Sequence, residues 1–285
     1  MRLSVIIPCY NASEFIRTQL EALAAQEWDG DWEVVVADNG STDGSLRIVD
    51  EFRDRLPGLR IVDASDRRGR GHARNVGARA STGDALLFCD ADDKVGVGWL
   101  AAMARALAEH DFVACGTETK ELNPPWLQWP AWQANGPQPY RYPPYLPHAG
   151  GGTLGVKRAV FERVGGFDES LLRVQDCDFC WRVQLSGVPL EFARGAVLHV
   201  RQRDTFWGIF QQARGLGEYN VLLYKRYRQL GMPALSLRWS LAGWKSVVLS
   251  LLRVRDRAAL ARWIWRFAWR LGRLQASIKY QVLAL

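Results

Sequence analysis

The sequence predicts an α/β fold: a single, mostly parallel, twisted sheet flanked by helices. Three segments carry this prediction, because each has a short apolar run, then polar turn residues, then a helical pattern. The strand-like runs begin at Leu3, Trp32 and Ala85, and the first is closed by Pro8. Strands that alternate with helices in this way are typical of parallel sheets.

The first segment is a β-branched run that ends near Pro8 and is followed by a helical pattern. Asn11 or Ser13 is placed to cap this helix. The apolar positions of the expected helix are Phe15, Ile16, Leu20 and Leu23.

The second strand ends in Asp38 and Asn39, after which Gly40 permits a turn. Thr42 or Asp43 can cap the next helix, so a simple cap and turn explains these two residues well. It explains the pair Asp38 and Asn39 less well. Side chains at those two positions point up from the strand end, where a nucleobase or a ribose could bind.

The third strand runs directly into three carboxylates, Asp90, Asp92 and Asp93. Such a cluster repels itself unless a cation lies nearby. The carboxyl ends of strands in an open α/β sheet line the ligand crevice, and carboxylate oxygens suit Mg²⁺ or Mn²⁺ carrying a phosphate. A solvated acidic turn is the alternative, because Asp also favours turns for local reasons.

Five motifs follow one another over residues 3–182: IIPCYN, VVVADNGSTDGS, RGRGHARNVGARASTGDALLFCDADD, GGFDES and QDCDFCWR. In this order they give the chain a resemblance to the inverting glycosyltransferases of the large family 2, which have the GT-A fold with its Rossmann-like sheet. The resemblance implies a nucleotide-sugar donor, a divalent metal held by an Asp-x-Asp motif, and one carboxylate as catalytic base.

Matched residue by residue, the resemblance assigns the metal to Asp90 and Asp92, with Asp92 as the direct ligand. Relatives usually carry two acids where this chain has Asp38 and Asn39, and an Asn carbonyl oxygen can still accept a hydrogen bond from a base N3–H. The implied nucleotide-binding residues are Pro8, Tyr10, Asp38, Asn39, Arg74, Asp90 and Ala91.

After the acidic loop, the pattern predicts a helix over 97–110, a strand over 112–116, and then a loop over 122–147 that is rich in Pro, Trp and Tyr. Sugar rings stack on aromatic planes, so this loop is a candidate acceptor lid. Alternatively, the aromatic residues pack the loop rigidly on its own domain. The residues concerned are Trp126, Trp129, Trp132, Tyr140, Tyr142 and Tyr145.

A glycine-rich stretch at 150–155 lets the backbone approach a ligand closely, although triple glycine also marks a flexible hinge. In the family this stretch frames the donor sugar and its phosphates. The resemblance therefore makes His148, Gly152 and Thr153 candidates for contacts with the donor or acceptor sugar.

Asp176 opens an amphipathic helix, where the helix dipole favours an acid in any case. The family pattern here is Glu-Asp, and the resemblance gives Asp176 the role of the base that takes the acceptor proton. Gln175 replaces the Glu and is a candidate acceptor contact.

His199 follows the apolar run 196–198, and the resemblance implies a third metal ligand there, although a lone His in such a place is usually structural.

With 285 residues and 48% apolar content, the chain is long enough for one large α/β domain and an extension. We expect a catalytic domain over 1–200, with a nucleotide-binding half at 1–95 and an acceptor half at 96–200, and a basic helical extension over 201–285. The extension has 16 Lys and Arg but three acidic residues, a net charge of +13, against −6 for the first 200 residues.

The extension contains a helical pattern with arginines on one face and apolar residues on the other. This pattern favours a helix that lies in the plane of an anionic membrane. Packing on the catalytic domain with extended arginines is the alternative. Nucleic acid is a third possibility, but no known binding motif accompanies the charge, so we expect no nucleic-acid partner. The two faces carry Arg262, Arg266, Arg270 and Arg273, and Ile264, Trp265, Ala268, Trp269 and Leu271.

Five scattered cysteines make no disulfide framework and fit a reducing cytoplasm. We expect no N-terminal signal, because the first strand begins at Leu3, and no spanning helix, because no window of about 18 residues is apolar enough. We therefore expect a cytoplasmic protein that is peripheral on the inner face of the cell membrane.

Together these observations predict a metal-dependent inverting glycosyltransferase, a hexosyl- or deoxyhexosyltransferase. It would use Mg²⁺ or Mn²⁺, a nucleotide-sugar donor and a glycan or lipid-linked acceptor. A sugar nucleotidyltransferase is one alternative, but the glycine-rich basic phosphate loop of that class is absent near the N-terminus. A catalytically inactive membrane scaffold with the same fold is the other, and the intact Asp90, Asp92 and Asp176 argue against it.

Overall fold

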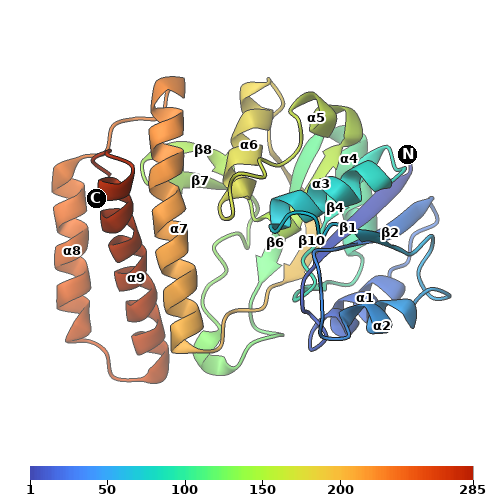
Figure 1. Ribbon diagram of the computed structural model, residues 1–285, viewed down its shortest axis with the longest axis horizontal. Coiled ribbons are helices and arrows are strands. Elements are labelled where there is room, and N and C mark those ends of the chain that lie inside the picture. The colour runs from blue at the N-terminus through green and yellow to red at the C-terminus, as the bar shows by residue number, and fades with distance from the viewer. Residues whose placement is uncertain (285) are drawn as a thin grey trace. The chain divides into compact units, whose positions relative to one another are not determined.

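The computed structural model describes residues 1–284, without the side chains of residues 237 and 239 (Figure 1). The chain forms two compact units. The first unit comprises Met1–Leu122, Pro130–Gln138 and Pro147–Arg201, and the second comprises Asn123–Trp129, Pro139–Leu146 and the chain from Gln202 onward. The sequence analysis did not anticipate that two short segments of the 122–147 loop belong with the C-terminal extension.

An eight-stranded sheet forms the centre of the first unit, with strand order β3-β2-β1-β4-β9-β6-β10-β5. Strands β1 to β4 pair in parallel, as do β6 and β10, whereas β9 and β5 are antiparallel to their neighbours. The predicted mostly parallel sheet is therefore confirmed. The strands are β1 (Leu3–Cys9), β2 (Trp32–Asp38), β3 (Arg60–Asp63), β4 (Ala85–Phe88), β5 (Lys94–Val95), β6 (Phe112–Glu118), β9 (Leu154–Lys157) and β10 (Glu191–His199).

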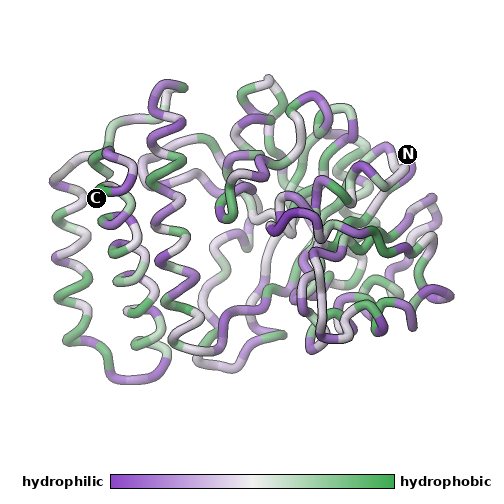
Figure 2. Tube along the Cα trace, viewed as in Figure 1, coloured by the Kyte–Doolittle hydropathy of each residue, from purple (hydrophilic) through white to green (hydrophobic). Residues whose placement is uncertain are grey.

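Helices cover both faces of this sheet. On one face lie α1 (Ile16–Ala24), α2 (Ser45–Asp50) and α4 (Trp99–Glu109), whose buried side chains share a core with Val5 and Ile7. The central strands β1 and β2 are mostly hydrophobic in Figure 2 and buried along nearly their whole length, as expected for parallel strands covered on both sides. Helix α4 and strand β6 confirm the helix and strand predicted after the acidic loop.

The other face carries α3 (Arg70–Ala80), α5 (Arg158–Arg163) and α6 (Gln175–Leu185). A cluster of phenylalanines joins these helices to the strands: the ring of Phe167 lies 5.3 Å from Phe88 and 4.5 Å from Phe179 between centroids. Phe179 also meets Phe112 of β6 edge to face at 5.7 Å. Aromatic packing of this kind fixes α6, and hence its N-terminus, against the sheet.

The turns after β1 and β2 hold each other, so the predicted cap of α1 by Asn11 or Ser13 is wrong. Asn11 has a left-handed backbone (φ 46°), and its Oδ1 accepts a hydrogen bond from Thr42 N at 2.8 Å. In return, the carboxylate of Asp43 accepts one from Ser13 N at 2.9 Å. Parallel neighbouring strands end side by side, so their turn residues can bond across rather than along the chain.

The second unit is mainly helical, with α7 (Phe206–Tyr227), α8 (Leu237–Leu251) and α9 (Arg257–Lys279). Gly272 lets α9 lie directly on α7, because a Cβ there would fall 2.0 Å from Arg214 O. The smaller elements are the 3₁₀ turns η1 (Pro125–Leu127) and η3 (Arg228–Leu230) and the hairpin of β7 (Gln138–Arg141) and β8 (Pro144–His148). Every helix within residues 1–284 is too short or too polar to span a bilayer.

Helix α9 presents only part of the arginine face that the sequence analysis expected, because Arg262 and Arg266 are exposed whereas Arg270 and Arg273 are partly or fully buried. Arg273 is 1% exposed, its guanidinium lies 4.7 Å from the centre of the Trp269 ring, and burial lowers its pKa to about 10. Trp265 packs in a core with Ile209 of α7 and Leu127 of η1. The buried part of the α9 pattern thus reflects packing inside the second unit.

Glu33 of β2 is a fully buried carboxylate that joins three segments. It accepts hydrogen bonds from Ser4 Oγ at 2.7 Å and Thr82 N at 2.6 Å, and pairs with Arg60 at 2.6 Å. Burial alone would raise the pKa of Glu33, but these contacts outweigh it and lower the pKa to about 2.

We predict that Glu33→Gln lowers the free energy of unfolding by roughly 2 kcal/mol at pH 7, because the charged acceptor is lost from a buried network. The folded-state pKa of Glu33 lies below the ordinary 4.5, so its contribution is present above pH 4.5 and disappears as the pH falls toward 2. The two proteins should therefore converge in acid. Denaturant titrations between pH 7 and pH 3 measure this, with the exposed Glu27→Gln as control. A difference that stays constant with pH would contradict the prediction.

Candidate active site

Three carboxylates meet in the loop that follows β4. Asp90, Asp92 and Asp93 each place one oxygen within 4.8 Å of the others. Asp93 is buried, and its Oδ1 accepts a hydrogen bond from Arg201 N at 2.9 Å. Burial, and then the charges of Asp92 and Asp90, raise the pKa of Asp93 well above its ordinary value. The loop thus has the excess negative charge and the oxygen ligands that a divalent cation requires.

Two arginines on one face of α3 point at this loop. Arg74 is buried and donates from Nη2 to Asp90 Oδ1 at 2.5 Å, while Arg70 Nη1 lies 3.8 Å from Asp90 Oδ2. Negative charge, chiefly that of Asp90 but also of Asp176, raises the pKa of Arg70. Within residues 1–284, Nε and Nη1 of Arg74 are buried without a hydrogen-bond partner. The pair therefore offers an anion site beside the acidic loop.

The glycine-rich stretch passes between this anion site and Asp176. A Cβ on Gly151 would fall 2.5 Å from Arg74 Nη1, and one on Gly152 would fall 3.1 Å from Asp90 N. Only a residue without a side chain allows this approach. Gly151 N also donates to Asp176 Oδ2 at 3.1 Å, so the glycines connect the acidic loop to the start of α6.

Asp176 and Gln175 stand in the first turn of α6. Val174, just before them, has a left-handed backbone (φ 52°), which is strained for a β-branched residue and is common at functional sites. Asp176 Oδ1 accepts a hydrogen bond from Cys177 N at 2.9 Å. Gln175 is buried, and its Oε1 has no partner among the described residues.

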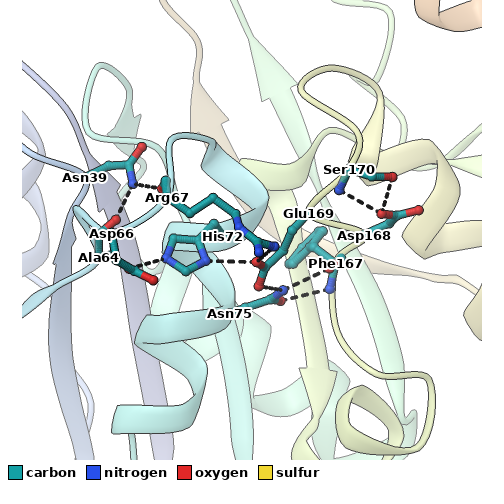
Figure 3. A network of polar contacts seen from close by, with 10 residues as sticks. All are labelled: Asn39, Ala64, Asp66, Arg67, His72, Asn75, Phe167, Asp168, Glu169 and Ser170. Atoms are coloured by element: carbon teal, nitrogen blue, oxygen red, sulfur yellow. Dashed lines mark hydrogen bonds and ion pairs between the residues drawn. The ribbon is translucent and has the colours of Figure 1, made fainter.

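Asn39 and Asp38 hold the loops at the end of β2. Asn39 Nδ2 donates to Ala64 O at 2.5 Å and to Arg67 O at 2.8 Å (Figure 3), and its Oδ1 accepts from Gly69 N at 2.9 Å. Both amide hydrogens are thus in use, a task that an aspartate could not perform. The Asp38 carboxylate accepts hydrogen bonds from the backbone of the following turn, 3.1 Å from Ser41 N.

His72 joins the loop after β3 to the segment before α6 (Figure 3). Its ring nitrogens lie 2.8 Å from Asp66 Oδ1 and 2.9 Å from Glu169 Oε2. Asn75 adds bonds to Phe167 O at 2.8 Å and to Glu169 Oε1 at 2.9 Å. This network fixes the start of α3, and with it the direction of Arg70 and Arg74.

The remaining candidates for nucleotide binding, which are Tyr10, Pro8 and Ala91, differ in how far they are exposed. Tyr10 is 50% exposed at the end of β1, with the Arg68 guanidinium 5.8 Å from its ring centre. Pro8 is buried inside β1, and Ala91 is buried in the acidic loop. Tyr10 is therefore the member of this group with an accessible aromatic surface.

Thr153 and His148 border the same glycine stretch. Thr153 is buried: its Oγ1 accepts from Gln133 Nε2 at 2.8 Å and donates to Gly150 O at 2.7 Å, so it holds the stretch in place. His148 donates from Nδ1 to Gln138 O at 3.0 Å. Burial lowers its pKa although the charge of Asp176 opposes this. The indole of Trp132, 52% exposed, stacks on the His148 ring at 5.0 Å.

His199 does not join the three aspartates. Its Nδ1 lies 2.6 Å from Glu118 Oε2 and 3.2 Å from Glu121 Oε2, which makes a separate group. Lys94 forms an ion pair with Glu121, and a cleft of about 340 Å³ borders Glu121 and His199. In this structure the histidine is held by two glutamates that the sequence analysis did not consider.

For the aromatic residues of the 122–147 loop, the sequence analysis gave two interpretations, an acceptor lid and rigid packing. Five of its six aromatic residues pack within the second unit: Trp126 and Trp129 pack on Leu127 and its neighbours, Tyr142 lies 4.8 Å from Trp269, Tyr145 donates to Leu230 O at 2.8 Å, and Tyr140 bonds Asn220. These five residues do pack, but with the C-terminal extension and not on the domain to which the sequence analysis assigned the loop. Trp132 alone of the six is exposed, and it stacks on His148.

Comparison with known proteins agrees with this geometry. Residues 4–165, more than half of the chain, match the family described as Glycosyl transferase family 2. The chain belongs to glycosyltransferase family 2. The matched region includes the acidic loop, both arginines and the glycine stretch, and it ends before α6.

Two curated relatives are 37% identical to parts of this family 2 chain. The uncharacterized glycosyltransferase YfnE of Bacillus subtilis aligns over 123 residues, 43% of this chain and 31% of its own length. The poly(ribitol-phosphate) beta-N-acetylglucosaminyltransferase TarS of Staphylococcus aureus aligns over 112 residues, 39% of this chain and 19% of its own. The alignments thus span less than a third of either relative.

Solved structures confirm the GT-A fold. The mannosyltransferase PcManGT of Pyrobaculum calidifontis, in complex with GDP-Man and Mn²⁺, superposes with a TM-score of 0.66 at 21% identity, over 96% of this chain and 86% of that one. TarS residues 1–349 of Staphylococcus aureus, in complex with UDP-GlcNAc, give 0.59 at 20% identity, over 99% and 93%. Likeness at these identities concerns the fold alone.

Sequence reasoning missed Arg70 and Arg201, and it named Gly151 only as part of the 150–155 stretch. The first could have been found, because Arg70 and Arg74 are four residues apart and so share a helix face. Arg201 gives no such signal: besides its bond to Asp93, its Nε donates to Asp92 O at 3.1 Å, a contact that depends on the meeting of β10 with the acidic loop.

We predict that Arg70→Ala weakens binding of a nucleoside diphosphate with Mn²⁺ by roughly tenfold or more, because a charge-assisted contact to phosphate is lost. Arg70 is half exposed, so the fold should persist. Isothermal titration calorimetry measures the affinity, and Arg79→Ala, exposed at the other end of α3, is the matched control. Unchanged affinity in Arg70→Ala would exclude Arg70 from the anion site.

Proposed function

We propose that this protein transfers a sugar from a nucleotide-sugar donor to an acceptor hydroxyl, with inversion at the anomeric carbon and with the help of a divalent cation. One observation carries the proposal: an acidic loop, a pair of arginines and a separate carboxylate, Asp176, meet around Gly151 and Gly152. The arrangement has one place for a metal diphosphate and another for a proton acceptor.

Mg²⁺ or Mn²⁺ fits the acidic loop, because its three carboxylates converge and repel one another. Asp92 and Asp90 would hold the ion, while Asp93 is occupied by Arg201. When bound, the cation offsets the charge of the diphosphate and so favours its departure. The Mn²⁺ in the PcManGT complex supports this assignment for a protein of the same fold. The location of His199 beside Glu118 and Glu121 leaves it out of the ligand set that we propose.

For the donor, Arg74 and Arg70 are placed to bind the phosphates. Phosphate oxygens would supply the partners that Nε and Nη1 of Arg74 lack. The exposed ring of Tyr10 offers a surface on which the base can stack, and Asp38 lies at the neighbouring strand end for the ribose. Pro8, Asn39 and Ala91 shape this pocket. UDP-GlcNAc in TarS and GDP-Man in PcManGT agree with a hexose donor.

Asp176 is the proposed base. Backbone N–H groups of Gly151 and Cys177 hold its two oxygens. The acceptor oxygen forms a bond to the anomeric carbon as the bond to the diphosphate oxygen breaks. The acceptor proton moves to Asp176, and the electron pair leaves with the diphosphate. Attack from the face opposite to the leaving group inverts the configuration.

The acceptor sugar would lie near Gln175, Gly152 and the Trp132–His148 pair. The buried Gln175 Oε1 needs a donor, and the exposed Trp132 ring can stack on a sugar face. Because TarS is named for poly(ribitol-phosphate) as acceptor, we propose a cell-envelope or lipid-linked glycan, reached from the inner face of the membrane. In this proposal the chemistry resides in residues 1–200.

Thermal stabilisation by nucleoside diphosphates and nucleotide sugars, with and without Mn²⁺, tests the proposal and identifies the nucleotide. We expect one nucleotide to raise the melting temperature, and only when the metal is present. If no nucleotide and metal pair stabilises the protein, the proposed function is wrong.

The first prediction from this function concerns the metal. Asp92→Ala should abolish sugar transfer and the Mn²⁺-dependent stabilisation by nucleoside diphosphate while the fold is retained, because the cation loses its main ligand. A transfer assay and thermal shift measure the two losses, circular dichroism checks the fold, and the exposed Asp54→Ala is the control. Normal metal-dependent stabilisation of Asp92→Ala would place the metal elsewhere.

A second prediction separates the base from the donor site. Asp176→Asn keeps the shape of the side chain and one acceptor oxygen for a backbone N–H but cannot take a proton, so kcat should fall by at least ~10² while donor affinity changes little. Steady-state kinetics and donor titration report the two quantities separately. Equal losses in both would make Asp176 a donor ligand instead.

A further inference from the structure

One side of α8 packs inside the second unit. Ser240 and Val247 are buried, and Trp263 of α9 donates from Nε1 to Val247 O at 3.0 Å. The ring of Trp244 meets Phe267 of α9 edge to face at 6.4 Å. These contacts fix which side of α8 faces inward.

The opposite side of α8 is exposed and unexpectedly apolar. Positions 238, 241, 245, 248 and 252 follow at steps of three and four, so they form one stripe along the helix. Leu241 is 68% exposed, Val248 65% and Leu252 81%. In Figure 2 hydrophobic residues recur along α8, although Ser240 and Val247 are the only buried residues among its described side chains. An exposed apolar stripe on a helix indicates a surface that is covered in use.

The same stripe is basic. Arg238 and Lys245 are exposed within it, and no Asp or Glu occurs between residues 219 and 255, which hold seven Lys and Arg. Such a combination of leucines with lysine and arginine, without acids, complements a surface that is both apolar and negatively charged. Two copies of the stripe placed together would bring like charges into contact, which disfavours self-association.

We infer that the stripe formed by Arg238, Leu241, Lys245, Val248 and Leu252, the α8 stripe, is the surface by which this protein docks on an anionic lipid bilayer. The helix lies in the plane of the interface, with the apolar side chains among the acyl chains and the two basic groups at the level of the headgroups. A helix of 15 residues is about 22 Å long, too short to cross the membrane. The inference rests on the proposed function in one respect: docking would give the protein access to a lipid-linked acceptor.

The assignment moves the membrane contact from α9 to α8. The arginines of α9 that the sequence singled out include Arg273, which is buried, and Arg270, which lies against Gly243 of α8. Arg270 and Arg273 serve helix packing, and Arg262 and Arg266 are exposed. The α8 stripe has instead the exposure that membrane contact requires.

Vesicle flotation of the full chain tests this inference. Wild-type protein should float with vesicles of phosphatidylglycerol and phosphatidylcholine at low salt, much less at ~0.5 M salt, and not with phosphatidylcholine alone, because exposed charges are screened within about 10 Å at 0.1 M salt. Leu241→Asp/Leu252→Asp should lower the bound fraction by at least ~10-fold, because each leucine loses its apolar contact. Lys245→Glu should weaken binding and reduce its salt dependence.

Matched controls keep the result specific. Leu185→Asp removes a similarly exposed leucine at the end of α6, and Arg163→Glu makes the same charge change on α5; both should float like wild type. If wild type ignores acidic vesicles, or if the double variant and Leu185→Asp lose binding equally, the inference is wrong. It is also wrong if light scattering shows a dimer that Leu241→Asp/Leu252→Asp dissociates, because the stripe is then an interface between copies.

Failure of this inference can be told from failure of the proposed function. Stabilisation of Leu241→Asp/Leu252→Asp by a nucleoside diphosphate with Mn²⁺ should equal that of wild type, because the stripe touches none of the active-site residues. Wild-type protein that floats with acidic vesicles but shows no such stabilisation would preserve the docking surface and overturn the transferase mechanism.

Discussion

The ion pair between Arg74 and Asp90 is the contact on which the site depends. Arg74 is buried between α3 and the glycine stretch, its Nη2 bonds Asp90 at 2.5 Å, and its guanidinium lies 5.4 Å from the Phe167 ring. A buried guanidinium with N–H groups left unpaired costs about 1–3 kcal/mol for each group. The fold retains this cost where a bound phosphate would remove it. Binding energy stored in this way favours the occupied state of the site.

Around this pair, the fold uses side chains at strand ends to fix loops. Asn39 holds the loop that leads to α3, and His72 ties that loop to the segment before α6. The Phe167–Phe179 stack then joins α6 to the same layer. The anion site and Asp176 come from segments about 100 residues apart in sequence, and these contacts keep their separation constant. Catalysis by positioning requires such rigidity.

Local patterns allowed the sequence to predict much of this architecture. The acidic loop, Asp38 and Asn39 all follow apolar strands, and parallel strands bring their carboxyl ends to one edge. Contacts between residues far apart in the sequence could not be predicted from these local patterns. The preference of His199 for Glu118 and Glu121 depends on the register of β10 on β6, where His199 lies opposite Glu118. Likewise, no local pattern distinguishes Trp132 from the five aromatic residues that pack with the C-terminal helices. Nor does the sequence show that Arg273 is buried while one side of α8 is exposed.

The most direct test of the account is the location of the metal. A crystal soaked with Mn²⁺ and a nucleoside diphosphate, measured at the manganese absorption edge, gives an anomalous peak at each bound ion. The account predicts one peak between Asp90 and Asp92, with the diphosphate oxygens on Arg70 and Arg74. A single peak between Glu118, Glu121 and His199, with none at the acidic loop, would contradict it.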